Sequence, residues 1–325
     1  MEGLQVILLS CLLTFLFISP MATAQLSPSY YANICPNLET IVHDVIKQKS
    51  GESVIVAPGV LRLYFHDCFV NGCDASIMLI SPTQDDEWHS PDDMSLTAEG
   101  FNAIVSAKVA VDSDPQCNSK VSCADILAIA ARDVVSLKGG PLYTVELGRL
   151  DGKISTKDSV VLPHPNFDLD QLNAMFAKFN LTQTDMVALS GAHTFGVAHC
   201  EKFWYRLYNY SSTVKTDPSL DPGFAAFLMQ QCPQQYNPIS FVFLDAVNPL
   251  NFDNGYYVAL QQGRGLLGSD EVLYTDSRSK GTVDLFASNQ ATFYDAFVTA
   301  ITKLGRIGIK NTTDGEIRLD CSKVN

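Results

Sequence analysis

Most of the chain carries apolar residues at the spacing of amphipathic helices. Residues 38–49, LETIVHDVIKQK, predict a helix with one buried face. Its apolar stripe consists of Ile41, Val42, Val45 and Ile46. Residues 123–140, CADILAIAARDVVSLKGG, predict a more apolar helix that ends at a pair of glycines. Strand-like runs are few and short, with YTVEL at 143–147 as an example. The pattern predicts a mainly α fold.

Two later helices are predicted from the polar residues at their starts. DLDQLNAMFAKF begins with a capping box formed by Asp168 and Gln171, and TQTDMVALSG begins with another formed by Thr182 and Asp185. The sequence contains no repeat, low-complexity tract or long linker, so nothing in it separates one domain from another.

The first residues have a different character. VILLSCLLTFLFI at 6–18 is a short apolar run, and the small residues Ala22 and Ala24 follow it. This pattern predicts a signal peptide over residues 1–24, cut before Gln25. No other apolar run approaches the length of about 18 residues that a membrane span needs. We therefore expect a soluble, secreted mature chain.

Cysteine content and charge agree with secretion. Loss of Cys11 with the signal leaves eight cysteines, which predict four disulfides whose pairing the spacing leaves open. No CxxC pair is present, so a zinc site is a poor alternative. Glycosylation sequons at Asn180, Asn209 and Asn311 fit the secretory route, although their occupancy stays open. A formal charge of −13 argues against a nucleic-acid partner.

Candidate chemistry is concentrated in LRLYFHDCFVNGCDAS at residues 61–76. If residues 54–68 form a helix, Arg62 and His66 are four positions apart and lie on one face. An isolated R-x-x-x-H is most often part of an exposed ion-pair helix. Here the apolar residues around the pair favour a buried functional site.

The loop after this helix is rich in oxygen ligands. Asp67, Asp74 and Ser76 supply side-chain oxygens, and a disulfide within the loop would turn the carbonyls of Val70 and Gly72 toward them. Hard oxygen ligands in a tight loop predict a calcium site. The twelve-residue ligand pattern of an EF-hand is absent.

Six segments together resemble the signature of the secretory plant peroxidases, the class III heme peroxidases: RLYFHDCFVNGCDAS, VSCADILAIAARD, GGPLYTVELGRLDG, ALSGAHTFGVAHC, FDNGYY and GLLGSD. The likeness spans the mature chain from QLSPSYYANICPN to CSKVN, in family order. The resemblance implies a mainly α heme peroxidase fold, in which two helical lobes sandwich the heme, with few short strands and four disulfides. It further implies a single domain over residues 25–325.

The resemblance also implies the cofactor and the catalytic residues. One heme b would be held by His193 of SGAHTFG, with Asp270 of GLLGSD as its partner. A carboxylate that accepts the Nδ1 proton makes the imidazole more anionic and stabilises high-valent iron. His66 would transfer the peroxide proton, and Arg62 would stabilise charge as the O–O bond breaks. Phenolic donors would then reduce a ferryl intermediate in one-electron steps, near Pro163 of LPHP.

Two calcium ions follow from the same resemblance. Glu87 is added to the first site, and Thr194, Asp245, Asn248 and Asp253 form the second. Asn248 stands where Thr is usual, and its amide oxygen can still bind calcium. The implied disulfides are Cys35–Cys117, Cys68–Cys73, Cys123–Cys321 and Cys200–Cys232.

One departure from the family concerns the residue that orients His66. The family usually has an Asn there, whereas EWHSPDDMSL offers Asp93, with Glu87 as the acidic residue behind it. A carboxylate would raise the pKa of His66. Alternatively, Asp93 and Glu87 would share one proton, so that Asp93 behaves as a neutral residue. The first outcome is slightly favoured.

Two other functional classes are alternatives to the peroxidase interpretation. A secreted structural or carbohydrate-binding protein could keep the scaffold without turnover, but the intact catalytic residues argue against it. A calcium- or zinc-dependent hydrolase using His66 and Asp67 would need no heme. We expect hydrogen peroxide and small phenolic donors as partners, no membrane contact after signal removal, and a monomer. The short C-terminal tail favours the apoplast or cell wall over the vacuole, and the physiological donor is not specified.

Overall fold

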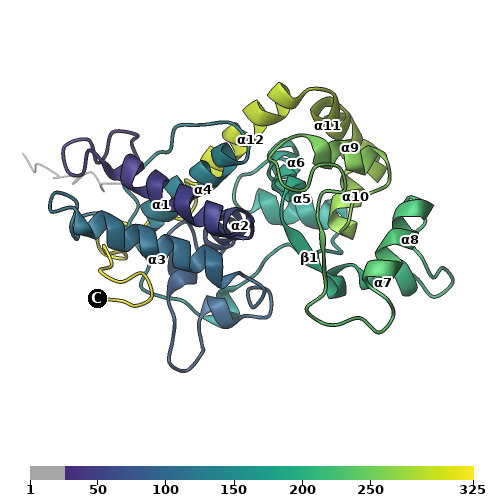
Figure 1. Ribbon diagram of the computed structural model, residues 1–325, viewed down its shortest axis with the longest axis horizontal. Coiled ribbons are helices and arrows are strands. Elements are labelled where there is room, and N and C mark those ends of the chain that lie inside the picture. The colour runs from purple at the N-terminus through teal and green to yellow at the C-terminus, as the bar shows by residue number, and fades with distance from the viewer. Residues whose placement is uncertain (1–25) are drawn as a thin grey trace, which may run out of the picture.

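The computed structural model describes residues 26–325, and Figure 1 shows their arrangement. The predicted signal peptide, residues 1–24, lies outside the described residues, as does Cys11. The α-helices are α1 (Leu38–Glu52), α2 (Val56–Phe69), α3 (Ala98–Ser113), α4 (Cys123–Leu137), α5 (Leu169–Ala177), α6 (Gln183–Ser190), α7 (Trp204–Tyr208), α8 (Pro222–Gln231), α9 (Gly255–Gln261), α10 (Gly268–Thr275), α11 (Ser277–Ser288) and α12 (Gln290–Leu304). The 3-10 helices are η1 (Ser76–Met78), η2 (Glu87–His89), η3 (Lys157–Ser159), η4 (Gly191–Thr194) and η5 (Cys200–Lys202), and the strands are β1 (Val197–His199) and β2 (Phe241–Phe243).

The helices form the two expected lobes. Helices α1 to α4 pack on one another in the first lobe, and α5 to α11 gather in the second (Figure 1). Helix α12 contacts α6 and α11 of the second lobe and also α2 of the first. After α12 the chain returns to the first lobe and ends near α3 (Figure 1). Over residues 26–325, no helix is long and apolar enough to cross a membrane.

The helix boundaries follow the predicted signals. Helix α1 buries Val42 and Ile46 of its apolar stripe. Both capping boxes form, at the starts of α5 and α6. Helix α4 is buried over most of its length and ends just before Gly139, whose φ of 93° suits a residue without a Cβ. Local sequence signals therefore account for these helices.

The prediction of a strand at residues 143–147 is wrong. Only Leu147 makes a bridge, an isolated one to Ser27. Val145 and Leu147 are buried, so the alternation is real, but the segment packs on the core as extended chain without a neighbouring strand. The sheet found among the described residues instead pairs β1 with β2 in antiparallel register, Val197 opposite Phe243.

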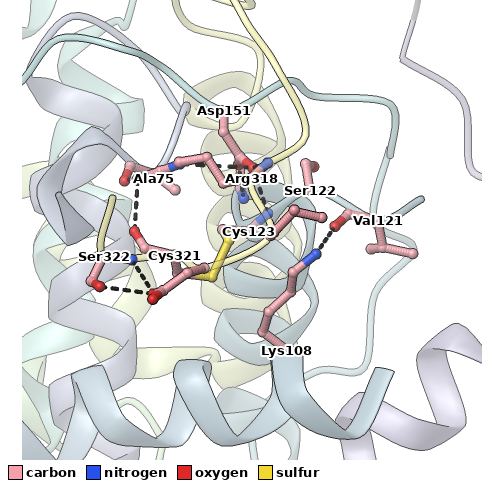
Figure 2. Close-up of a disulfide and its surroundings, with 12 residues drawn as sticks. Ala75, Lys108, Val121, Ser122, Cys123, Asp151, Arg318, Cys321 and Ser322 are labelled. Carbon is pink, nitrogen blue, oxygen red and sulfur yellow. Dashed lines mark hydrogen bonds and ion pairs between the residues drawn. A yellow bond between two sulfur atoms is a disulfide. The ribbon is translucent and has the colours of Figure 1, made fainter. Parts of the chain in front are cut away.

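All four expected disulfides form. Figure 2 shows the pair that closes the longest loop, Cys123–Cys321. Beside it, Asp151 Oδ2 accepts hydrogen bonds from the backbone N–H of Cys123 at 3.1 Å and of Arg318 at 2.9 Å. The buried Arg318 guanidinium donates to the carbonyls of Ala75 and Cys321. The C-terminal segment is thus fixed within the first lobe, to the start of α4 and to the loop after α2, and the disulfide closes a loop that contains the second lobe.

Candidate active site

Arg62 and His66 lie one turn apart on α2, which is buried on nearly all sides. Arg62 Nε–H donates to His66 Nε2 at 3.1 Å. The predicted i, i+4 pair therefore exists, and both side chains point to the same place. Because Arg cannot lose its proton at ordinary pH, this arrangement keeps a fixed positive charge beside the imidazole.

The loop before α3 holds the Arg62 guanidinium. Nη1 donates to the Ser95 carbonyl at 2.8 Å, and Nη2 donates to Ser95 Oγ at 3.0 Å and to the Asp92 carbonyl at 3.3 Å. These acceptors are neutral, so they orient the cation without cancelling its charge. Sequence reasoning missed both residues, and no local pattern around Ser95 indicates the role.

The same loop supplies the partner of His66. Asp93 is fully buried, and its Oδ1 lies in close hydrogen-bonding contact with His66 Nδ1, while its Oδ2 accepts from Ser90 Oγ at 3.0 Å. Glu87 Oε2 instead accepts from Ser76 Oγ at 3.3 Å. The structure therefore does not contain the shared-proton arrangement between Asp93 and Glu87. We call Arg62, His66 and Asp93 the α2 cluster.

Burial decides the titration of His66. Burial lowers the pKa of His66, and the Arg62 charge lowers it further, whereas the hydrogen bond and charge of Asp93 raise it. The net direction is downward from the ordinary pKa of His66, although Asp93 by itself acts upward, as expected of a carboxylate in place of Asn. The contribution of Asp93 has the expected sign but does not outweigh desolvation. A neutral His66 carries its proton on Nδ1, facing Asp93, and its Nε2 lone pair accepts the hydrogen bond from Arg62 Nε–H.

A second cluster forms around His193, which lies in η4 directly after α6. His193 Nδ1–H donates to Asp270 Oδ1 at 2.8 Å, and the Tyr256 hydroxyl donates to the same oxygen at 2.8 Å. Asp270 Oδ2 accepts from the Leu267 N–H at 3.3 Å, at the start of α10. We call His193, Asp270 and Tyr256 the η4 cluster. Tyr256 belongs to the FDNGYY segment, but sequence reasoning assigned no role to this tyrosine.

The charge of Arg62 acts on the η4 cluster. Burial lowers the pKa of His193, but the charge and hydrogen bond of Asp270 more than offset it and give a net rise, while Arg62 acts in the lowering direction. Arg62 is therefore close enough for its charge to act on His193. The His193 side chain nevertheless keeps 38% of its surface accessible. Within residues 26–325, no hydrogen bond engages its Nε2.

Three buried carboxyl groups, those of Asp67, Asp74 and Glu87, lie around the loop that follows α2. Asp67 accepts from Ala75 N–H at 2.9 Å, and Asp74 pairs with Lys310 Nζ at 3.1 Å. Glu87 Oε1 is buried without a hydrogen-bond partner. Burial, and then the charges of Asp67 and Asp74, raise the pKa of Glu87 to about 9. Burial and the Asp74 charge also raise the pKa of Asp67 well above its ordinary value. Without a further cation, burial and mutual repulsion therefore favour the protonated forms of Glu87 and Asp67.

The expected ligands of the first calcium ion lie in this loop. Val70, Gly72 and Ser76 are all buried there, and Gly72 has a φ of 115°. A Cβ on Gly72 would lie 2.5 Å from Gly308 Cα, so the turn requires glycine. Over residues 26–325, no three Asp, Glu, His or Cys side chains form a metal-binding group by themselves. A cation in this loop therefore needs hydroxyl and main-chain oxygens as well.

Three expected ligands of the second calcium ion, Thr194, Asp245 and Asp253, lie close together. Thr194 Oγ1 lies 3.2 Å from Asp245 Oδ2 and 3.5 Å from Asp253 Oδ1. Asn248 presents its amide nitrogen to Asp253 and its amide oxygen to Asn251. Its oxygen would face a cation only after the amide turns over.

Pro163, the expected donor-site residue, is half-buried. Its neighbour His164 has Nδ1 3.9 Å from Asp92 Oδ1. The segment of Pro163 therefore lies beside the loop that holds Arg62.

Comparisons with known proteins agree with this architecture. The sequence model of the family described as Peroxidase matches residues 41–289. Peroxidase 45 of Arabidopsis thaliana is 54% identical over 95% of this chain and 95% of its own length. Peroxidase 16 of the same plant is 54% identical over 96% of this chain and 97% of its own. A peroxidase of Armoracia rusticana is 42% identical over 94% of this chain and 93% of its own.

Proposed function

Because this chain belongs to the peroxidase family and is a heme peroxidase, we propose that the α2 cluster and the η4 cluster are the two halves of its active site. The reaction reduces hydrogen peroxide and oxidises phenolic donors one electron at a time. The observation that carries the assignment is the hydrogen bond from His193 Nδ1–H to Asp270, which leaves His193 Nε2 without a hydrogen bond within residues 26–325. The charge of Arg62 acts on the same imidazole.

The η4 cluster fits a heme ligand. With Nδ1 bonded to Asp270, the Nε2 lone pair of His193 is available to a metal, and a histidine backed by a carboxylate is a common donor set for heme iron. One heme b, bound through this nitrogen, would supply the redox chemistry. Asp270 keeps the His193 proton on Nδ1 and makes the imidazole a stronger electron donor.

The α2 cluster moves the protons of peroxide. Asp93 holds the Nδ1–H of His66, which leaves the lone pair on Nε2. When peroxide takes the place of the Arg62 Nε–H at that lone pair, Nε2 accepts a proton from hydrogen peroxide and returns it to the departing oxygen as water forms. Arg62, oriented by Ser95, stabilises negative charge on the oxygen that leaves. The Asp92 side chain lies near the segment of Pro163, which we propose contacts the phenolic donor.

Two calcium ions complete the proposed enzyme. At the first site, the orphaned Glu87 oxygen and the buried carboxyl groups of Asp67 and Asp74 fit a divalent cation, which would displace the protons that the raised pKa values favour. At the second, Thr194 and Asp245 are buried together, and burial raises the pKa of Asp245. Because each site adjoins a catalytic histidine in the sequence, calcium would stabilise both faces of the active site.

We also propose that the mature chain, residues 25–325, is one secreted domain that works as a monomer in the apoplast or cell wall. Four disulfides support an oxidising destination.

The role of His66 is tested by separating the peroxide step from donor oxidation. In heme-loaded His66→Ala, the first spectral change after mixing with peroxide should slow by at least about 100-fold, the low end for a positioned acid–base group. Subsequent oxidation of a simple phenol should change far less. His43→Ala, on the outer part of α1, is the matched control and should behave as wild type. Equal losses in both steps for His66→Ala would assign His66 a structural role only.

A further inference from the structure

Asp270 Oδ1 serves two donors at the same time. His193 Nδ1–H and the Tyr256 hydroxyl each lie 2.8 Å from it. Tyr256 is almost fully buried in α9, and its ring lies edge-on to the His193 ring with centroids 6.1 Å apart. Within the described chain, the Tyr256 hydroxyl has no hydrogen-bond acceptor other than this oxygen.

We infer that Tyr256 is a positioning residue that limits how strongly Asp270 polarises His193. The inference rests on the proposed role of His193 as the iron ligand. An oxygen that accepts two hydrogen bonds gives less of its electron density to each donor. The Tyr256 hydroxyl thus weakens the pull of Asp270 on the His193 proton and keeps the imidazole closer to neutral.

The hydroxyl is a permanent donor in this place. Burial, and then the charge of Asp270, raise the pKa of Tyr256 well above its ordinary value, so it keeps its proton at every pH at which the protein works. Asp270 Oδ2 is engaged by the Leu267 N–H, and the Tyr256 hydroxyl lies on Oδ1 instead. The competition for Oδ1 is therefore built into the fold.

Removal of the Tyr256 hydroxyl should change the iron–histidine bond in a defined direction. In Tyr256→Phe, Asp270 Oδ1 interacts with His193 alone, so the imidazole becomes more anionic and binds iron more strongly. The iron–histidine stretching frequency of the ferrous protein should rise. A more anionic imidazole should also stabilise the ferric form relative to the ferrous form. At a fixed potential the ferric-to-ferrous ratio should therefore increase several-fold, and a tenfold increase corresponds to a 59 mV drop in the reduction potential.

The neighbouring tyrosine provides a matched control. Tyr257 is equally buried in α9, but its hydroxyl donates to the Val187 carbonyl at 2.8 Å and does not contact Asp270. Tyr257→Phe therefore removes a buried hydroxyl and its hydrogen bond from the same helix, while it keeps the ring that packs edge-on against Tyr256.

The experiment records the resonance Raman iron–histidine mode and the redox titration of the heme-loaded wild type, Tyr256→Phe and Tyr257→Phe. It repeats the Tyr256 comparison in an Asp270→Asn background. We expect both shifts in Tyr256→Phe, neither in Tyr257→Phe, and none from the Tyr256 change once Asp270 is Asn. These readouts do not depend on turnover.

Three results would overturn the inference. One is an unshifted mode and an unshifted potential in Tyr256→Phe. Another is an equal shift in Tyr257→Phe, which would indicate general loosening of α9. A persistent Tyr256 effect without the Asp270 carboxylate would mean that the hydroxyl acts by another route. Failure of the proposed function looks different, because the wild type itself would then show no iron–histidine mode, and the inference would fall with it.

Discussion

Calcium binding to the loop after α2 should release protons. Burial raises the pKa of Glu87 to about 9, followed in importance by the charges of Asp67 and Asp74. At pH 7 the metal-free protein therefore holds a proton on Glu87, which calcium must displace. For one displaced proton the apparent affinity falls about tenfold per pH unit below that pKa, which amounts to about 100-fold between pH 9 and pH 7.

The measurement is a calorimetric titration of the calcium-free protein at pH 7, in two buffers that differ in ionisation enthalpy. We expect release of at least about one proton in the wild type, because the pKa of Asp67 is raised in the same direction. Glu87→Gln should release about one proton fewer. Glu99→Gln, an exposed glutamate at the start of α3, should match the wild type.

The raised pKa of Glu87 also predicts how the stability of the metal-free protein changes with pH. A glutamate whose pKa is raised from 4.5 to about 9 binds its proton more tightly in the folded protein than in the unfolded chain. The metal-free protein should therefore lose stability as pH rises through that window, and calcium should abolish much of the loss. Zero proton release at pH 7, or identical release by the wild type and Glu87→Gln, would refute the account of this loop.

Three further predictions concern the loop before α3, the Cys123–Cys321 disulfide and the expected donor site. Because the Asp93 charge raises the pKa of His66, Asp93→Asn should move the acid limb of the peroxide reaction, measured by stopped flow, to lower pH; an unmoved limb would show that the carboxylate charge does not control His66. Replacing Cys123 and Cys321 with Ser opens a loop with a sequence separation of 198 and should cost about 4–5 kcal/mol in denaturant unfolding, so a loss below about 1 kcal/mol would contradict a stabilising role for this disulfide. Pro163→Ala should raise the KM for a simple phenol and leave the peroxide step unchanged, whereas an effect on the peroxide step alone would place Pro163 elsewhere.

The features that the sequence predicted correctly are either contacts between residues close together in the chain or features implied by the resemblance to the family. Arg62 and His66 meet because residues four apart share a helix face, so finding the helix was sufficient. The capping boxes of α5 and α6 use side chains three residues apart, and both form. The disulfide pairings came from the resemblance, since spacing alone leaves many connectivities open.

The features that sequence missed depend on tertiary contacts. Ser95 reaches Arg62 across 33 positions, and Tyr256 reaches Asp270 from a different helix. No periodicity encodes such contacts. Strands β1 and β2 have three residues each, too few for an alternating pattern to stand out. The titration of His66 depended on burial, which only the packed structure supplies.

The central claim is that His193 holds the heme opposite Arg62 and His66, and heme uptake by His193→Ala tests it most directly. The variant should fold with its disulfides closed, verified by circular dichroism and the absence of free thiols. In a titration with heme it should bind weakly and lack the Soret spectrum of the wild type, while His199→Ala, six residues further along, should bind as the wild type does. Wild-type affinity and a normal five-coordinate high-spin spectrum in His193→Ala would contradict the account.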